Sequence, residues 1–211
     1  MIFAIRSRLL LDYWEISEKG TGTMKEIRIH ARAGQGAITT AMLLASAAFE
    51  ENFYGLAFPH FGAERMGAPL NAFVRLSQSP INVRTQVREP DYVLVQDSTL
   101  LRGFDVTTGL KPNGLVIIND ERAPSELGLS AGVRVLTIPA SRLATEFLGR
   151  ADRASTAMLG AFSAATGEIK LESLKKAVLN RFPGPVGEKN IKVLERAAEL
   201  AQSSPACLVT K

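Results

Sequence analysis

The chain has 211 residues, of which 46% are hydrophobic and 22% are charged, and its formal net charge is +4. This length and composition suit one α/β domain whose core needs neither disulfides nor a structural metal. Basic residues are scattered among acidic ones, which argues against a nucleic-acid-binding face, and one cysteine with two histidines cannot build an iron–sulfur cluster or a zinc site.

Residues 1–23 are predicted to be a leader extension that lies outside the folded core. Arg6 and Arg8 interrupt the early apolar run, and no small-residue cleavage site follows them. No stretch reaches the ~18 continuous apolar residues of a membrane helix. We therefore expect the fold to begin at Met24 and the protein to be cytoplasmic.

The first folded unit is predicted to be a strand, a glycine turn and a helix. Residues 26–31 alternate in polarity, Gly34 and Gly36 follow, and residues 37–51 are rich in helix formers. This order opens many parallel α/β sheets. Residues 52–69 mix glycine and proline with aromatic residues, which predicts a long loop that is ordered by packing.

The rest of the chain predicts more strands and then helices. Strands are expected at 70–77, 92–96, 114–118 and 133–138, and short helical pieces near 98–103 and 139–148. The last third has helical periodicity in three segments, near 158–165, 171–182 and 186–202. The prediction is a Rossmann-like three-layer α/β fold with an open, mostly parallel sheet and a helical C-terminal portion. Residues 24–202 form one domain, and 203–211 a flexible tail.

The turn Gly34-Gln35-Gly36 stands where a dinucleotide fold places its phosphate loop. Its glycines permit a tight turn, and the following helix start offers N–H groups to an anion. Thr39 replaces the third glycine of the dinucleotide fingerprint, and no carboxylate lies near residues 54–59, where a ribose-binding acid is expected. Three readings stay open: a structural turn, a phosphate site shared with a partner chain, and an autonomous NAD or FAD site.

Two segments together resemble the γ subunits and γ-like domains of 2-oxoacid:ferredoxin oxidoreductases. Residues 29–37, Ile-His-Ala-Arg-Ala-Gly-Gln-Gly-Ala, resemble the family's G-x-G-G-Q-G turn. Residues 61–69, Phe-Gly-Ala-Glu-Arg-Met-Gly-Ala-Pro, with the strand after them, resemble its F-G-x-E-R-R-G-A-P block. A looser likeness runs from Met24 to about Gln202. The chain departs from the pattern at Ala31 and Ala33, which replace glycines, and at Met66, which replaces an arginine.

The resemblance implies a γ subunit within an αβγδ or fused complex of the pyruvate type. Such a complex converts pyruvate, coenzyme A and oxidised ferredoxin into acetyl-CoA, CO2 and reduced ferredoxin. By this resemblance, thiamine diphosphate, Mg and [4Fe-4S] clusters belong to partner chains, and the γ chain carries no catalytic group, no metal and no tightly bound cofactor. The α, β and δ subunits and ferredoxin are the expected partners.

The candidate site residues fall in the two motifs. Gly34, Gln35, Gly36 and Arg32 are candidate contacts for coenzyme A or a phosphate. The expected interface with partner subunits is formed by Phe61, Glu64, Arg65, Met66 and Pro69, whose apolar members would otherwise be an exposed patch.

Three other polar residues have plainer predicted roles. His30 and His60 are expected to be ordinary packed or surface histidines. Asp97 follows the strand predicted at 92–96, at the edge where α/β ligands bind, and its expected role is to cap the next helix.

Other functions remain open at this point. The γ subunit of a 2-oxoisovalerate or 2-oxoglutarate ferredoxin oxidoreductase would carry similar motifs. A free-standing nucleotide-dependent enzyme would bind NAD(P) or flavin by itself. An assembly scaffold would make no contact with coenzyme A.

Overall fold

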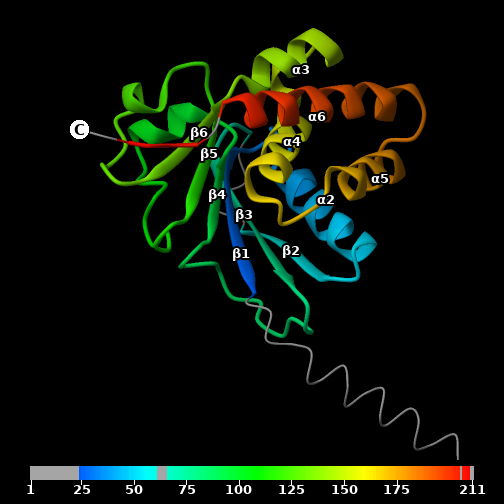
Figure 1. Ribbon diagram of the computed structural model, residues 1–211, viewed down its shortest axis with the longest axis horizontal. Coiled ribbons are helices and arrows are strands. Elements are labelled where there is room, and N and C mark those ends of the chain that lie inside the picture. Colours follow the sequence, from blue (N-terminus) through cyan, green and yellow to red (C-terminus); the bar gives the residue numbers. More distant parts are fainter. Residues whose placement is uncertain (1–23, 61–65, 205, 210–211) are drawn as a thin grey trace, which may run out of the picture.

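The computed structural model describes residues 24–60, 66–204 and 206–209. Its centre is a seven-stranded sheet in the order β2-β3-β1-β4-β5-β6-β7 (Figure 1). The strands are β1 (Lys25–Arg32), β2 (Tyr54–His60), β3 (Pro69–Ser77), β4 (Tyr92–Val95), β5 (Leu115–Asn119), β6 (Arg134–Ile138) and β7 (Cys207–Leu208). The α-helices are α2 (Ala37–Glu50), α3 (Ala140–Leu148), α4 (Ser155–Thr166), α5 (Leu171–Arg181) and α6 (Pro185–Ser203). Three short 3-10 helices are η1 (Ser98–Arg102), η2 (Pro124–Glu126) and η3 (Ala151–Arg153).

The middle of the sheet is parallel and its two edges are antiparallel. β1 pairs with β4, β4 with β5 and β5 with β6 in parallel register. β3 runs antiparallel to β1 and to β2, and β7 runs antiparallel to β6. The predicted open, mostly parallel α/β sheet is confirmed, as are the strands predicted at 26–31, 70–77, 92–96, 114–118 and 133–138.

The long loop predicted at 52–69 is wrong over its first half, because Tyr54–His60 forms the edge strand β2. Gly55 and Pro59 suggested a loop, but Gly55 has a packing reason. A Cβ atom at this position would lie 2.5 Å from the carbonyl oxygen of Ala45, so only glycine lets α2 approach the strand. Residues 61–65 lie outside the described part of the chain.

The α-helices gather on one side of the sheet, and short turns and loops lie on the other (Figure 1). On the helical side, the main core joins alternate residues of the strands to the apolar faces of α2, α4, α5 and α6. The opposite side has a smaller core that covers β4, β5 and β6. The third layer of the predicted architecture is thus built from loops and 3-10 helices, and not from α-helices.

The C-terminal segment adds a strand to the far edge of the sheet. Cys207 and Leu208 pair with Val135 and Arg134, and the N–H of Val209 donates to the carbonyl of Val133 at 2.9 Å. Val209 is buried. This arrangement differs from the flexible tail predicted for 203–211. None of the helices in the described residues combines the length and apolar character needed to cross a membrane.

Candidate functional site

The glycine turn joins the carboxyl end of β1 to the start of α2. Gly34 and Gly36 have φ angles of 98° and 81°, a region that residues with a side chain rarely adopt. Gly36 is the N-cap of α2, which begins without a side-chain cap and without an acidic residue in its first turn. An uncapped helix start has unsatisfied N–H groups and a positive dipole end, which together favour an anion.

The second motif packs directly against this turn. The N–H of Ala33 donates to the carbonyl of Ala68 at 2.9 Å, and the N–H of Gly67 donates to the carbonyl of Ala33 at 3.2 Å. A Cβ atom on Gly34 would lie 2.9 Å from Sδ of Met66. The two segments that carry the family resemblance are therefore neighbours in space, which the sequence alone did not show.

Gln35 links the turn to the loop after β4. Its Oε1 accepts from the backbone N–H of Arg32 at 2.8 Å, and its Nε2 donates to Oδ2 of Asp97 at 2.8 Å. Burial alone would raise the pKa of Asp97, but hydrogen bonds from Thr99 and Gln35 hold that pKa below its ordinary value. Asp97 also accepts from the N–H of Thr99 and caps η1, so its predicted capping role is confirmed.

All three nitrogens of the Arg32 guanidinium contact residues of this network. Its Nε lies 3.2 Å from Oδ2 of Asp97, its Nη2 donates to Oγ1 of Thr99 at 2.9 Å, and its Nη1 donates to the carbonyl of Gly67 at 3.2 Å. Arg32 thus stiffens the turn from the sheet face that lies opposite the α-helices.

A pocket of about 460 Å³ opens on the helical side of the turn. Gly36, Ser155 and Val186 line it, so the first turns of α2, α4 and α6 meet there. Four basic side chains and one carboxylate also line this basic pocket: Arg150, Arg153, Arg181, Lys189 and Asp152. The excess of positive charge and the three helix starts favour a bound anion. Gln35 and Gly36 are the predicted residues that the structure places in its wall.

Sequence reasoning missed the basic side chains of this pocket. They come from η3, its flanks, the end of α5 and the first turns of α6, which lie more than a hundred residues after the glycine turn. The only local signal was the Arg-Ala-Asp-Arg stretch at 150–153, just before a predicted helix.

A second, more polar hollow of about 360 Å³ lies along the carboxyl ends of β4, β5 and β6. Gln35 lines it as well, so this polar groove adjoins the basic pocket. Its other residues are Gln96, Asp97, Ser98, Asn119, Asp120, Glu121, Pro139, Ser141 and Arg142. The groove lies next to the boundary between the parallel strands β1 and β4. The connections that follow these two strands lead toward opposite edges of the sheet, and open α/β folds bind ligands at such a switch point.

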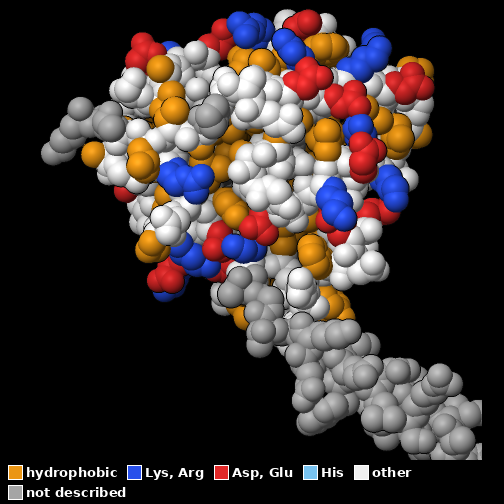
Figure 2. Space-filling model, viewed as in Figure 1, with side chains coloured by type: hydrophobic (Ala, Val, Ile, Leu, Met, Phe, Trp, Pro, Cys, Tyr) orange, Lys and Arg blue, Asp and Glu red, His pale blue; other side chains and the backbone are white. Residues whose placement is uncertain are grey.

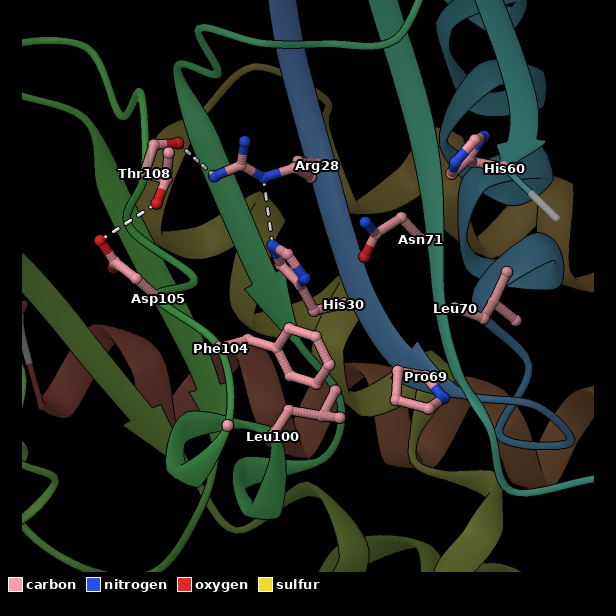
Figure 3. Close-up of a pocket in the computed structure, with 11 residues that line it drawn as sticks. Arg28, His30, His60, Pro69, Leu70, Asn71, Leu100, Phe104, Asp105 and Thr108 are labelled. Atoms are coloured by element: carbon pink, nitrogen blue, oxygen red, sulfur yellow. Dashed lines mark hydrogen bonds between the residues drawn. The ribbon is translucent and has the colours of Figure 1, made fainter. Parts of the chain in front are cut away.

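A third pocket, of about 480 Å³, lies on the sheet face that has no α-helices (Figure 3). Arg28 and His30 project into it from β1, Asn71 from β3 and His60 from β2, and Phe104 faces them from the opposite loop. Nε of Arg28 donates to Nε2 of His30 at 3.1 Å. Burial first, and then the neighbouring Arg28 charge, lower the pKa of His30 to about 4. His30 is therefore packed, as predicted, and it is neutral at physiological pH.

The predicted interface can be located only in part. Phe61, Glu64 and Arg65 lie outside the described residues. Met66 has 89% of its surface exposed, and Pro69 is exposed at the start of β3. Pro69 also lines the third pocket, so the second motif leads onto the sheet face without helices.

Charge on the visible face of the molecule is mixed. Figure 2 shows basic and acidic side chains interspersed over the helices. Within the part of the chain that the structure describes, no group of three or more His, Cys, Asp and Glu side chains could hold a metal ion.

Comparisons with known proteins agree on one family. The model of the family described as pyruvate ferredoxin/flavodoxin oxidoreductase matches residues 26–200. Pyruvate synthase subunit PorC of Methanocaldococcus jannaschii is 48% identical over 174 residues, which cover 82% of this chain and 95% of that protein. The pyruvate/ketoisovalerate oxidoreductases common subunit gamma of Thermococcus kodakarensis is 48% identical over 178 residues, with 82% and 95% covered. Among solved structures, pyruvate oxidoreductase subunit PORC of Thermotoga maritima superposes with a TM-score of 0.74 at 34% identity, over 83% of this chain and 96% of that chain.

Proposed function

Because the chain belongs to the pyruvate ferredoxin/flavodoxin oxidoreductase family, we propose that it is the γ subunit of pyruvate:ferredoxin oxidoreductase, also called pyruvate synthase. Relatives named pyruvate synthase subunit PorC at 48% identity over most of both chains support this assignment. The proposed γ-type domain spans residues 24–202, in line with the family match over residues 26–200.

The proposed reaction converts pyruvate, coenzyme A and oxidised ferredoxin into acetyl-CoA, CO2 and reduced ferredoxin. We place thiamine diphosphate, Mg and [4Fe-4S] clusters, which would supply decarboxylation and electron transfer, on α, β and δ partner subunits in a cytoplasmic complex. One cysteine in 211 residues cannot provide the thiolates of a cluster, which supports this division of labour. The role proposed for this chain is to dock beside the chains that carry the reactive groups and to help bind a co-substrate.

Docking is assigned to the second motif. The proposed contact residues are Phe61, Glu64, Arg65, Met66 and Pro69. Met66 supports this proposal because its apolar side chain is 89% exposed. A partner that covers this side chain removes apolar surface from water, which stabilises the complex. The hydrogen bonds between this segment and Ala33 then connect the docking surface to the glycine turn.

Co-substrate binding is assigned to the glycine turn and the basic pocket. Gly34, Gln35 and Gly36 would let phosphate oxygens approach the start of α2, and Arg32 would hold the turn through Asp97 and Thr99. The observation that carries this proposal is the convergence of three helix starts with Arg150, Arg153, Arg181 and Lys189. Coenzyme A carries several phosphates and is the co-substrate that such a pocket would suit.

The test is to isolate the complex from its native source through a tag on this chain. We expect partner subunits to co-purify and the complex to reduce ferredoxin when pyruvate and coenzyme A are both present. Turnover of pyruvate by this chain alone, or its recovery without partners, would contradict the proposal.

The same assay should also be run with a second oxoacid, 2-oxoisovalerate. Relatives from Thermococcus and Pyrococcus are named as a γ subunit common to pyruvate and ketoisovalerate oxidoreductases. We therefore propose as an alternative that this chain also serves a 2-oxoisovalerate enzyme. Two separable complexes that contain this chain, each active with one of the two oxoacids, would support the shared role.

A further inference from the structure

The third pocket contains a cation that is almost buried and forms no salt bridge within the described residues. Arg28 lines the pocket from β1 and is only 8% exposed. Its Nη2 donates to two backbone carbonyls of the loop after η1, at 3.0 Å and 2.6 Å, and its Nε donates to His30. Arg75, the other buried arginine, instead has a carboxylate partner, Glu26, at 2.8 Å. Because buried charges in proteins are normally paired, an anion would be stabilised beside Arg28.

One nitrogen of this guanidinium remains available to a ligand. Nη1 of Arg28 makes no hydrogen bond with the described residues, whereas Nε and Nη2 do. In that part of the chain, only Oε1 of Gln96 is a side-chain atom that both lacks a partner and is closed off from solvent. Nη1 is therefore accessible, and a group inside the pocket can accept from it.

The polar neighbours of Arg28 also favour a ligand that accepts hydrogen bonds. Burial and the Arg28 charge lower the pKa of His30 to about 4, and a hydrogen bond with Asn71 opposes this fall. A contact that favours the protonated ring is one in which the ring donates, so the Asn71 oxygen accepts and its amide nitrogen is left as a donor. Figure 3 shows Asn71 projecting from β3 beside these two residues of β1. Asp105, also in the lining, already accepts from two neighbouring threonines.

The other walls of the pocket are mainly apolar. Leu70, Leu100 and Phe104 contribute to them, and Phe104 is 53% exposed. The volume of about 480 Å³ lies in the range of small-molecule sites, which combine apolar walls with a few placed polar groups. A small molecule can enter such a hollow whole, whereas a side chain of a partner stays attached to a backbone outside the rim. These features favour a free ligand with an anionic head and an apolar body.

We propose that the third pocket binds a small organic monocarboxylate. Its carboxylate accepts from Nη1 of Arg28 and from the amide nitrogen of Asn71, and its apolar body lies against Leu100 and Phe104. A guanidinium is the side chain best suited to a carboxylate, and a hydrogen bond between two charged groups is stronger than one between neutral groups. The site lies on the sheet face opposite the basic pocket, and it depends neither on the proposed co-substrate site nor on the identity of the 2-oxoacid.

The test titrates the full chain, labelled with nitrogen-15, with phenylacetate and with its neutral analogue phenylacetamide at pH 7. The NMR signals of Nε–H of Arg28 and of the Asn71 side-chain amide report on the pocket. We expect phenylacetate to shift both signals and to bind at least tenfold more tightly than phenylacetamide. Equal affinities, or shifts that leave both signals unchanged, would overturn the proposal.

The variant Asn71→Asp places a negative charge in the pocket and leaves the three hydrogen bonds of Arg28 intact. We expect it to lose at least tenfold in affinity for phenylacetate and to bind phenylacetamide about as well as the wild type. Asn52→Asp is the matched control, because Asn52 is exposed after α2 and does not line the pocket.

A Asn71→Asp chain that binds phenylacetate as tightly as the wild type would refute the site. If neither compound bound the wild type and Asn71→Asp weakened assembly with partner subunits, the pocket would receive an acidic side chain of a partner, and the proposal of a free ligand would be wrong. A failure of the proposed function would show differently, as a purified complex that does not turn over pyruvate.

Discussion

The backbone N–H of Ala33 lies 2.9 Å from the carbonyl oxygen of Ala68, and this hydrogen bond joins two segments that are 35 residues apart in the chain. Ala33 precedes the glycine turn, and Ala68 precedes β3. A partner chain that docks on the second motif would therefore bear directly on the backbone of the candidate phosphate site. The proposed docking surface and the proposed co-substrate site are therefore joined through the backbone.

Helices α4 and α6 pack at a glycine, and this contact predicts a stability effect. In most helix interiors, alanine stabilises relative to glycine by about 1 kcal/mol. At Gly160 of α4, a Cβ atom would overlap the carbonyl oxygen of Leu194 on α6. We expect Gly160→Ala to destabilise the chain by about 2 kcal/mol, because the helices must separate. Urea denaturation measures this change.

The matched control is Gly103→Ala. A Cβ atom at Gly103 meets nothing within 4 Å, and the residue does not have a positive φ angle. We expect a change within about 0.5 kcal/mol for this variant. Equal stability of the two variants would show that α4 and α6 are not in this close contact.

The lowered pKa of His30 predicts that the free energy of unfolding depends on pH. Its folded-state pKa of about 4 lies below the ordinary value of 6.5, so the unfolded chain binds the proton more readily. The contribution of His30 is therefore fully present above pH 6.5 and declines as the pH falls toward 4. The decline amounts to about 3 kcal/mol, since one pKa unit corresponds to 1.36 kcal/mol. Protonation would also remove the acceptor for Nε of Arg28.

The measurement compares urea denaturation of the wild type and His30→Asn between pH 4 and pH 7. Carboxylates contribute to the slope of both proteins, so the difference between the two slopes isolates His30. Identical slopes would mean that His30 is not buried beside Arg28.

The sequence predicted the centre of the sheet well because strands that are buried on both faces have a strong local signal. β4 and β5 are short apolar runs after clear turns, and both were placed within one residue of their observed bounds. β2 was missed because Gly55, which resembles a loop residue, is required by the approach of Ala45. β7 was missed because two residues of sequence cannot encode a pairing with β6 that is more than 70 residues away.

The candidate site was predictable only at the turn itself. The positions of Gly34 and Gly36 between a strand and a helix can be recognised from the local sequence, and in the structure both residues have positive φ angles. The basic pocket depends on Arg150, Arg181 and Lys189, which tertiary packing brings to the start of α2. Scattered basic residues look like a solvated surface in a sequence, so nothing except the Arg-Ala-Asp-Arg stretch at 150–153 separated these three from the others.

The basic pocket predicts a charge-specific effect on anion binding. Lys189 lines the pocket, whereas Lys192, three residues later on α6, is exposed outside its lining. We expect Lys189→Gln to weaken the binding of inorganic pyrophosphate by about fivefold at low salt, and Lys192→Gln to have little effect. Calorimetric titrations at two ionic strengths measure this, and the difference should shrink as salt screens the charges. Equal losses in both variants would indicate a diffuse effect of net charge instead of a pocket.

We predict that the substitution Met66→Glu prevents assembly with partner subunits but leaves the folding of this chain unchanged. Its side chain is 89% exposed and lies beside the glycine turn, so a charge there costs the isolated chain little. In the complex, Met66→Glu would bury an unpaired carboxylate, which a covered apolar contact does not tolerate. We expect at least a tenfold loss in affinity for the partner subunits, and an unchanged unfolding midpoint.

Leu208→Glu provides the matched control, because Leu208 is 60% exposed on β7, at the edge of the sheet farthest from β2. If Met66→Glu assembled as well as Leu208→Glu in pull-down titrations, the docking surface would have to lie elsewhere on the subunit.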